Sequence, residues 1–280
     1  MHICDMGEFL NTSVKLMDHE INNPRSDSNY HKDFTVGSPT QFRTSIRSVD
    51  DDSIALKIEN LSKIYDSGAA GKVIALRKIN FTIKKGEFVS IVGPSGSGKS
   101  TLLNLIGALD RPTAGKVYID GIDIFSLKDT EIATMRNNLI GFIFQSFNLI
   151  NRTTVQKNVE LPAIISGMSN TDRGRRALKI LEALGIDDKI RHKPSNLSGG
   201  QQQRVAIARS LVNDPTIILA DEPTGNLDTK TGDEIFHMLK TLSNKFGRTI
   251  VMVTHNPELA ESTDRTVLIK DGKIEKDIIN

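Results

Sequence analysis

Residues 88–101 read FVSIVGPSGSGKST and carry the strongest structural signal of the chain. The apolar run 88–92 predicts a strand buried on both faces. The glycine-rich run 93–101 fits the pattern G-x-x-x-x-G-K-[ST], in which successive backbone N–H groups face a concave centre and hold phosphate oxygens. A helix that begins near Ser100 would add its positive N-terminal end. Strand, loop and helix in this order predict a P-loop nucleotide site.

Two side chains of this loop add a charge and a metal ligand. Lys99 supplies a point charge for the β- and γ-phosphates of a nucleotide, and the Ser100 hydroxyl suits Mg²⁺. The alternative is a glycine-rich turn that fits the pattern by chance, and the expected strand and helix on either side argue against it. We therefore expect phosphate binding here.

On both sides of the loop, short β-rich runs alternate with helical patterns. This alternation predicts an α/β fold with a mainly parallel sheet covered by helices on both faces. The last β-rich run is followed by Asp271-Gly272, which predicts a closing hairpin. The expected strands are 54–58, 79–83, 88–92, 117–119, 140–144, 216–220, 249–253 and 267–270, and the expected helices are 100–109, 129–137, 173–184, 201–211 and 230–246.

Polar residues follow three of these strands and are candidates for catalysis. Asp221 suits the Mg²⁺ shell, mostly through water, and Glu222 suits a general base or a residue that positions water. His255 is placed for a γ-phosphate contact, and the Gln145 amide can bond metal and water at once. Polar strand ends are common and a lone histidine is usually a surface residue. The carboxyl ends of parallel strands share one edge, however, so the neighbouring phosphate loop favours the catalytic interpretation.

A second glycine-rich element precedes the helix expected at 201–211. Ser198 offers a hydroxyl, and Gly199 and Gly200 expose backbone N–H groups, so this helix start is a second anion site. One ATP needs one phosphate loop, and neither cradle alone encloses a triphosphate. The simplest solution is a symmetric head-to-tail dimer in which Ser198 of each chain closes over the ATP of the other.

In these elements the chain resembles the ATP-binding-cassette (ABC) ATPases from about Ile54 to the C-terminus. The resemblance implies a P-loop NTPase core with an N-terminal antiparallel β patch and an inserted α-helical subdomain at about 145–213, all within a nucleotide-binding domain at 53–280. It implies ATP and Mg²⁺ as cofactors. For ATP it assigns Tyr65, stacked on adenine, and the loop Gly93, Pro94, Ser95, Gly96, Ser97, Gly98, Lys99, Ser100 and Thr101. The signature, which contacts the ATP of the other chain, is Leu197, Ser198, Gly199, Gly200 and Gln201, and the D-loop is Asn226, Leu227 and Asp228. The catalytic residues are Glu222, His255, Gln145 and Lys99, and the Mg²⁺ ligands are Ser100, Gln145 and Asp221.

Residues 144–150, 160–162 and 222–228 are similar to the macrolide-exporter and lipoprotein-releasing branch (MacB- and LolD-like). This branch implies ATP hydrolysis by a homodimer that forms on ATP binding and powers a separate permease, in export or in extraction of lipids, lipoproteins or peptides. The alternative is an ATPase like the cell-division protein FtsE, which signals mechanically to a membrane partner that transports nothing. A soluble DNA-repair clamp would need a long coiled coil between the two motifs, and translation factors carry two cassettes. Glu222 and His255 argue against a non-hydrolysing scaffold.

Composition limits the location and the partners. The net charge is only +2, basic and acidic residues are interspersed and Trp is absent, so we expect no nucleic-acid partner. The chain has neither an apolar run of roughly 18 residues nor a basic start with an apolar core. Its single cysteine, Cys4, excludes an internal disulfide. The expected place is the cytosol, at the cytoplasmic face of the plasma membrane, where the chain is attached through the permease.

Three apolar residues follow Gln145 at the start of the expected helical subdomain. Phe147, Leu149 and Ile150 either belong to the core of that subdomain or line a groove for a short cytoplasmic helix of the permease. Both interpretations stay open on the sequence alone.

Residues 1–52 differ from the rest because they are rich in polar residues and end in the acidic run at 50–52. Such a composition predicts a disordered or loosely packed extension, either a mobile tail or a docking arm. Deletion of residues 1–52 is therefore expected to leave the melting temperature and the ATPase rate almost unchanged. Thermal unfolding and steady-state hydrolysis check this, and a loss of several degrees would show that the segment packs on the core.

Overall fold

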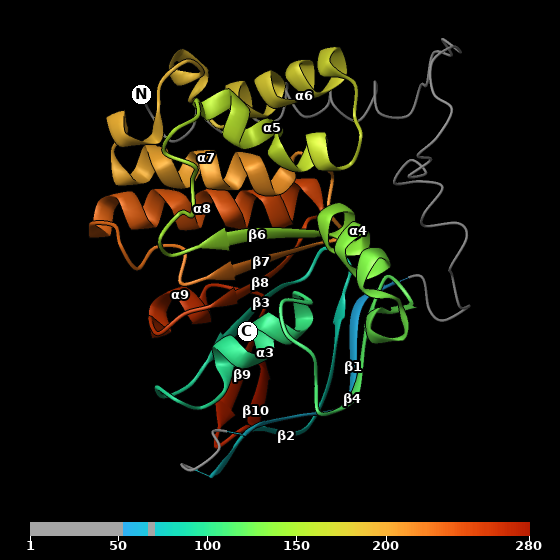
Figure 1. Ribbon diagram of the computed structural model, residues 1–280. Coiled ribbons are helices and arrows are strands. Elements are labelled where there is room, and N and C mark those ends of the chain that lie inside the picture. Colours follow the sequence, from blue (N-terminus) through green and yellow to red (C-terminus); the bar gives the residue numbers. More distant parts are fainter. Residues whose placement is uncertain (1–52, 67–70) are drawn as a thin grey trace.

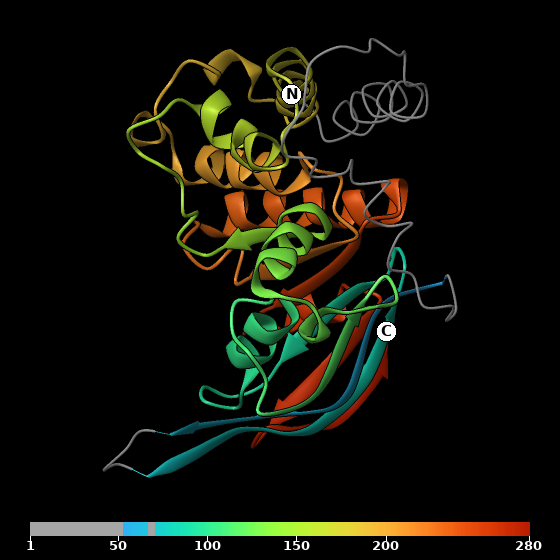
Figure 2. The same ribbon diagram turned by 45° about the vertical axis from the view of Figure 1, so that its right-hand side comes forward.

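The computed structural model describes residues 53–66 and 71–280, and the extension predicted at 1–52 lies outside these residues. Strands β1 (Ile54–Asp66), β2 (Lys72–Lys84), β4 (Ala114–Ile119) and β5 (Ile122–Asp123) form a sheet in the order β2-β1-β4-β5. All of its neighbouring strands are antiparallel. The predicted N-terminal antiparallel patch is confirmed, and Figure 2 shows β1 and β2 running side by side as a long hairpin.

The second sheet has six strands in the order β10-β9-β3-β8-β7-β6. Its neighbouring strands are parallel except for the β9–β10 hairpin, so the prediction of a mainly parallel sheet with a closing hairpin is confirmed. Because β3, β8, β7 and β6 are adjacent, the loops after these four strands share one edge. The strands are β3 (Phe88–Val92), β6 (Ile140–Phe144), β7 (Ile217–Asp221), β8 (Thr249–Val253), β9 (Arg265–Lys270) and β10 (Lys273–Ile279).

Helices cover both faces of the six-stranded sheet. Figure 1 shows α8 and α7 stacked above the sheet, with α5 and α6 further out, and α3 on the opposite face near the antiparallel sheet. In the part of the chain that the structure describes, no helix has the length and hydropathy that a membrane crossing requires. The helices are α3 (Lys99–Ile106), α4 (Asp129–Leu139), α5 (Val155–Ile165), α6 (Asn170–Ala183), α7 (Gly199–Leu211), α8 (Thr229–Phe246) and α9 (Pro257–Glu261), with 3₁₀ turns at Ile124–Ser126, Asp187–Lys189 and Pro194–Asn196.

Two apolar cores lie on the two faces of the sheet, because successive strand residues point to opposite sides. Ile217 and Leu219 belong to the core shared with α3, α4 and the antiparallel sheet. Ile218 and Ala220 belong to the core shared with α5 to α8. A strand that is buried on both faces reads as a continuous apolar run, which is why these strands could be recognised in the sequence.

The structure adds elements that the sequence analysis did not predict. Helix α5 begins after Thr154, whose side chain accepts from the Lys157 amide, and it contains Pro162. Helix α9 begins after an Asn256 cap with proline at its first position. Helices α5, α6 and α7 all lie between β6 and β7. We keep 145–213 as the proposed bounds of the helical subdomain, within a proposed domain at 53–280.

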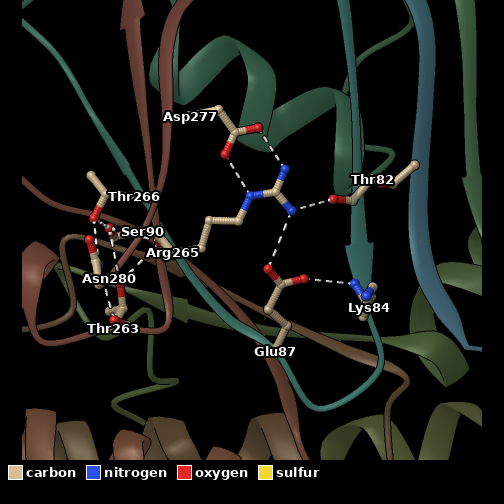
Figure 3. A network of polar contacts seen from close by, with 9 residues as sticks. All are labelled: Thr82, Lys84, Glu87, Ser90, Thr263, Arg265, Thr266, Asp277 and Asn280. Atoms are coloured by element: carbon tan, nitrogen blue, oxygen red, sulfur yellow. Dashed lines mark hydrogen bonds and ion pairs between the residues drawn. The ribbon is translucent and has the colours of Figure 1, made fainter.

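A polar network joins the C-terminal hairpin to both sheets, as Figure 3 shows. The Arg265 guanidinium forms a bidentate ion pair with Asp277, with both N–O distances at 2.6 Å. It also donates to the Thr82 carbonyl at 2.9 Å and pairs with Glu87 at 3.3 Å. The hydrogen bonds to Asp277 are the main reason that the pKa of Arg265 is raised. This network ties β9 to β2 of the antiparallel sheet and to Glu87, which directly precedes β3, the strand that leads into the phosphate loop.

Candidate functional site

The phosphate loop is packed so closely that only glycine fits at two positions. Gly93 has φ 151°, and a Cβ there would lie 2.1 Å from the Ile269 carbonyl oxygen. Gly98 has φ 106°, and a Cβ there would lie 2.6 Å from the Ala75 carbonyl oxygen. Real Cβ atoms do not approach backbone this closely, so both glycines are required by sterics as well as by conformation. The loop is therefore shaped by β9 and β2 together.

Lys99 lies at the start of α3, directly after the loop. Its ammonium group donates to the carbonyl oxygens of Gly93 and Pro94, both at 2.9 Å. No acidic residue occurs in the first turn of α3, so the positive end of this helix is not neutralised from within the helix. The arrangement combines a helix N-terminus, a curled backbone and a fixed cation, which is a site for phosphate.

Asp221 ends β7 in a partly buried position. Burial raises the pKa of its carboxyl group, the charge of Glu222 raises it further, and Lys99 lowers it. A desolvated carboxylate favours a cation nearby. No cluster of three or more His, Cys, Asp or Glu that could hold a metal occurs within residues 53–66 and 71–280. One carboxylate with the Ser100 hydroxyl and the Gln145 amide suits Mg²⁺, which takes most of its ligands from phosphate and water.

Glu222 and His255 are brought together at the ends of β7 and β8. The distance from Glu222 Oε2 to His255 Nδ1 is 3.1 Å. Glu222 has a left-handed backbone with φ 45°, and its amide donates to the Val253 carbonyl at 3.0 Å. Strained conformations of this kind are concentrated at functional sites, and nothing in the sequence indicated this one. The pair places a carboxylate and an imidazole where a water molecule could be activated.

Gln145 and the D-loop hold each other. The Gln145 amide nitrogen donates to Asn226 Oδ1 at 3.3 Å, and Asn226 Nδ2 donates back to the Gln145 carbonyl at 3.0 Å. A Cβ on Gly225 would lie 2.7 Å from the Gln145 amide nitrogen. Asp228 caps α8 by accepting from the Thr231 amide, and bonds from Thr231 lower the pKa of Asp228. The expected metal ligand and the D-loop thus form one contiguous surface.

The signature residues begin α7 and face the D-loop. Ser198 Oγ accepts from the Gln201 amide at 3.3 Å, while Gln201 Oε1 accepts from the Ser198 amide at 3.0 Å, which is a complete capping box. A Cβ on Gly199 would lie 3.1 Å from Leu227, and one on Gly200 would lie 2.4 Å from Thr231. The contacts of this helix start are therefore with the residues after Glu222.

Tyr65 is half-exposed at the end of β1. Its hydroxyl donates to Asp110 at 2.8 Å, and the Lys63 ammonium lies 4.7 Å from the ring centroid. Burial and then the bond to Asp110 raise the pKa of Tyr65, and a side-chain bond with Thr101 opposes this rise. Tyr65 is thereby tied to the segment that follows α3, and we keep adenine stacking as a proposal.

The structure also shows polar contacts that the sequence analysis missed. Gln203 is fully buried and donates to the Pro223 carbonyl, next to Glu222, at 2.6 Å. Arg209 donates to two carbonyls of the loop that follows Gln145. Arg209 directly follows the apolar run Val205-Ala206-Ile207-Ala208, and Gln203 lies two positions before it. Long polar residues beside such a run in a helix are a usable signal for buried polar contacts.

The fold and the site together define a P-loop ATPase of the cassette type. Residues 76–225 match the family described as ABC transporter. An uncharacterized ABC transporter ATP-binding protein of Thermotoga maritima is 53% identical over 220 residues, which is 79% of this chain and 93% of that protein. The macrolide export ATP-binding/permease protein MacB of Bartonella henselae is 49% identical over 225 residues, which is 80% of this chain but 34% of that protein.

Solved structures agree with this comparison. The dimeric structure of MJ0796, a bacterial ABC transporter cassette, matches with a TM-score of 0.73 and 50% identity over 80% of this chain and 98% of that one. A second structure of MJ0796, in a post-hydrolysis state bound to ADP and Pi, matches equally well. The chain belongs to the ABC transporter family. It is the ATP-binding cassette of a transporter and hydrolyses ATP.

Glu222→Gln tests the assignment of the general base. Glutamine keeps the size and the contact with His255 but cannot take a proton, so ATP binding should persist while kcat falls by about 10²-fold or more. Steady-state hydrolysis and nucleotide titration measure the two effects. Hydrolysis near the wild-type rate would show that Glu222 is not the base.

Proposed function

We propose that the chain is the ATP-hydrolysing subunit of a transporter whose permease is a separate chain, working in export or in extraction of a lipid, lipoprotein or peptide. The similarity to MacB supports this proposal, because MacB combines an ATP-binding part and a permease in one protein and this chain matches 34% of its length. Association with a permease would place the chain at the cytoplasmic face of the plasma membrane.

The observation that carries the proposed mechanism is the position of Ser198. One edge of the sheet carries Lys99, Asp221, Glu222 and His255, at or just beyond the ends of β3, β7 and β8. The glycines that follow Ser198 instead contact the D-loop and α8. Each chain thus presents a phosphate loop and a separate helix start that suits an anion. Two copies arranged head to tail would supply both halves to each ATP, with the partner's Ser198 opposite Lys99.

This arrangement assigns a task to each of these side chains. Lys99 binds the β- and γ-phosphates, Glu222 takes a proton from the attacking water, and His255 holds the Glu222 carboxylate and contacts the γ-phosphate. Bound Mg²⁺, held by Ser100, Asp221 and Gln145, would neutralise phosphate charge. Loss of the γ-phosphate removes contacts that only the closed dimer makes, so the dimer opens and can drive a membrane partner.

Ser198→Arg tests the shared site. Arginine would place a bulky charge in the cradle that faces the other copy, so each chain should bind ATP while ATP-dependent dimerisation and hydrolysis both fail. Light scattering with ATP and steady-state hydrolysis measure these effects. Ser126→Arg is the matched control, because Ser126 is an exposed serine outside the site and its substitution should change neither quantity. An active monomeric Ser198→Arg variant would refute the two-chain site.

The apolar residues after Gln145 divide into two kinds, which refines the docking hypothesis. Leu149 is partly buried and packs against the core of α5 to α8. Ile150 is 42% exposed. Packing therefore accounts for Leu149, whereas Ile150 remains available for the proposed cytoplasmic helix of the permease. The two hypotheses predict different results for a charge at each position.

We expect Ile150→Glu to abolish permease binding and partner-stimulated hydrolysis while the melting temperature and the basal ATPase rate stay unchanged. Leu149→Glu should instead lower the melting temperature, because it puts an unpaired charge against the core. Ile279→Glu is the control, since Ile279 is 84% exposed on β10. Co-purification from native membranes measures binding and identifies the partner. If Ile150→Glu still binds the permease and its hydrolysis is still stimulated by it, the docking surface lies elsewhere.

The same co-purification separates transport from the signalling alternative. A permease that carries a cargo into or across the membrane supports the transporter proposal. A division protein without transport activity would instead support the alternative, in which the ATPase signals mechanically to its membrane partner. In either case the position of the partner should depend on the nucleotide state, because the two are linked.

A further inference from the structure

Two consecutive residues of the loop after Gln145 have left-handed backbones. Phe147 has φ 60° and Asn148 has φ 50°. Asparagine tolerates this region, but for a bulky residue such as phenylalanine it is a true outlier that the surroundings must enforce. The Phe147 amide donates to the Phe144 carbonyl at 3.1 Å, which closes a tight turn around Gln145. Gln145 thus lies inside a turn whose last residue, Phe147, has a left-handed backbone.

Arg209, near the end of α7, bonds both of these residues. Its Nη1 donates to the Asn148 carbonyl at 2.6 Å, and its Nη2 donates to the Phe147 carbonyl at 2.9 Å. The planar guanidinium presents both donors at once in a fixed geometry, which the single ammonium of a lysine cannot do. One side chain thus fixes the two left-handed residues.

Arg209 makes this contact in a partly buried position, where its charge loses hydration. Burial lowers the pKa of Arg209, because a charged group loses hydration there. Its hydrogen bonds among the described residues are to backbone oxygens. Arg204 on the same helix instead bonds the Leu184 carbonyl and pairs with Glu234. Hydrogen bonds from a half-buried cation to the carbonyls of two left-handed residues restrain a loop more strongly than a surface ion pair does.

We propose that Arg209 is a positioning residue for Gln145, acting through the carbonyls of Phe147 and Asn148. It keeps the turn that sets the Gln145 amide beside Asn226, and it thereby supports hydrolysis without touching the nucleotide. The inference rests on the proposed role of Gln145 at the metal and the attacking water. Helix α7 begins at the signature, which in the proposed dimer closes over the ATP of the second copy. Through Arg209 the same helix also contacts the turn of Gln145, the residue proposed to respond to the ATP of its own chain.

A double-mutant cycle tests this connection on the full chain. Gln145→Ala and Arg209→Gln should each lower kcat by about 10-fold at saturating MgATP, because the first removes the Gln145 amide and the second misplaces it. The affinity for ATP should change by less than about 2-fold, since Lys99 and the phosphate loop are separate from this contact. The double variant should be no slower than Gln145→Ala alone. A structural role of Arg209 would give additive losses instead.

Arg204→Gln is the matched control, because it removes an arginine of the same helix whose partners lie away from Gln145. It should lower the melting temperature without lowering kcat. If Arg209→Gln does not fold, Arg209→Lys takes its place in the cycle with the same expectations.

The outcomes test the role of Gln145 and the role of Arg209 separately. Gln145→Ala at the wild-type rate would overturn the role of Gln145 and, with it, that of Arg209. A slow Gln145→Ala beside a fast Arg209→Gln, or additive losses in the double variant, would overturn the role of Arg209 alone.

Discussion

The close approach of three backbone segments around the phosphate loop is the constraint on which the site depends. A Cβ on Gly98 or on Gly272 would lie 2.6 Å from the same Ala75 carbonyl oxygen of β2. The Gly272 amide donates to the Ser97 carbonyl at 3.0 Å, and the Gly272 carbonyl accepts from the Arg77 amide at 2.8 Å. The loop is thus clamped between the antiparallel sheet and the C-terminal hairpin, so its N–H groups are oriented before a phosphate arrives.

From this fixed point the other loops extend along the edge of the sheet, and several of their side chains interact in pairs. Asp221 feels the charges of Lys99 and Glu222, Glu222 meets His255, and Gln145 meets Asn226. The start of α7 contacts the D-loop. A change at one of these residues therefore alters the contact or the charge that its partner meets. This gives a physical route between nucleotide chemistry and the helices above the sheet.

Much of the fold and the candidate site could be predicted because its signals are local. Buried parallel strands read as apolar runs, and the loop at 93–101 needs glycines at fixed spacings. Helix α5 was not predicted because Pro162 interrupts a helical pattern, although Thr154 is a residue type that commonly caps helices. The left-handed backbones of Glu222 and Phe147 have no local signal, since they are imposed by contacts with distant segments. Arg209, in contrast, had a local signal, because it is a long polar residue beside the apolar run at 205–208.

The order of strands in the sheet has a consequence for synthesis of the chain. Strand β3, which leads into the phosphate loop, pairs with β8 and β9, and these come from residues 249–253 and 265–270. The loop also needs the Ile269 carbonyl and Gly272 beside it. A growing chain on the ribosome therefore carries the whole phosphate motif long before that motif has its neighbours. The loop can reach its final packing only after residues 249–272 have been synthesised, so these segments set the moment at which the phosphate site is complete.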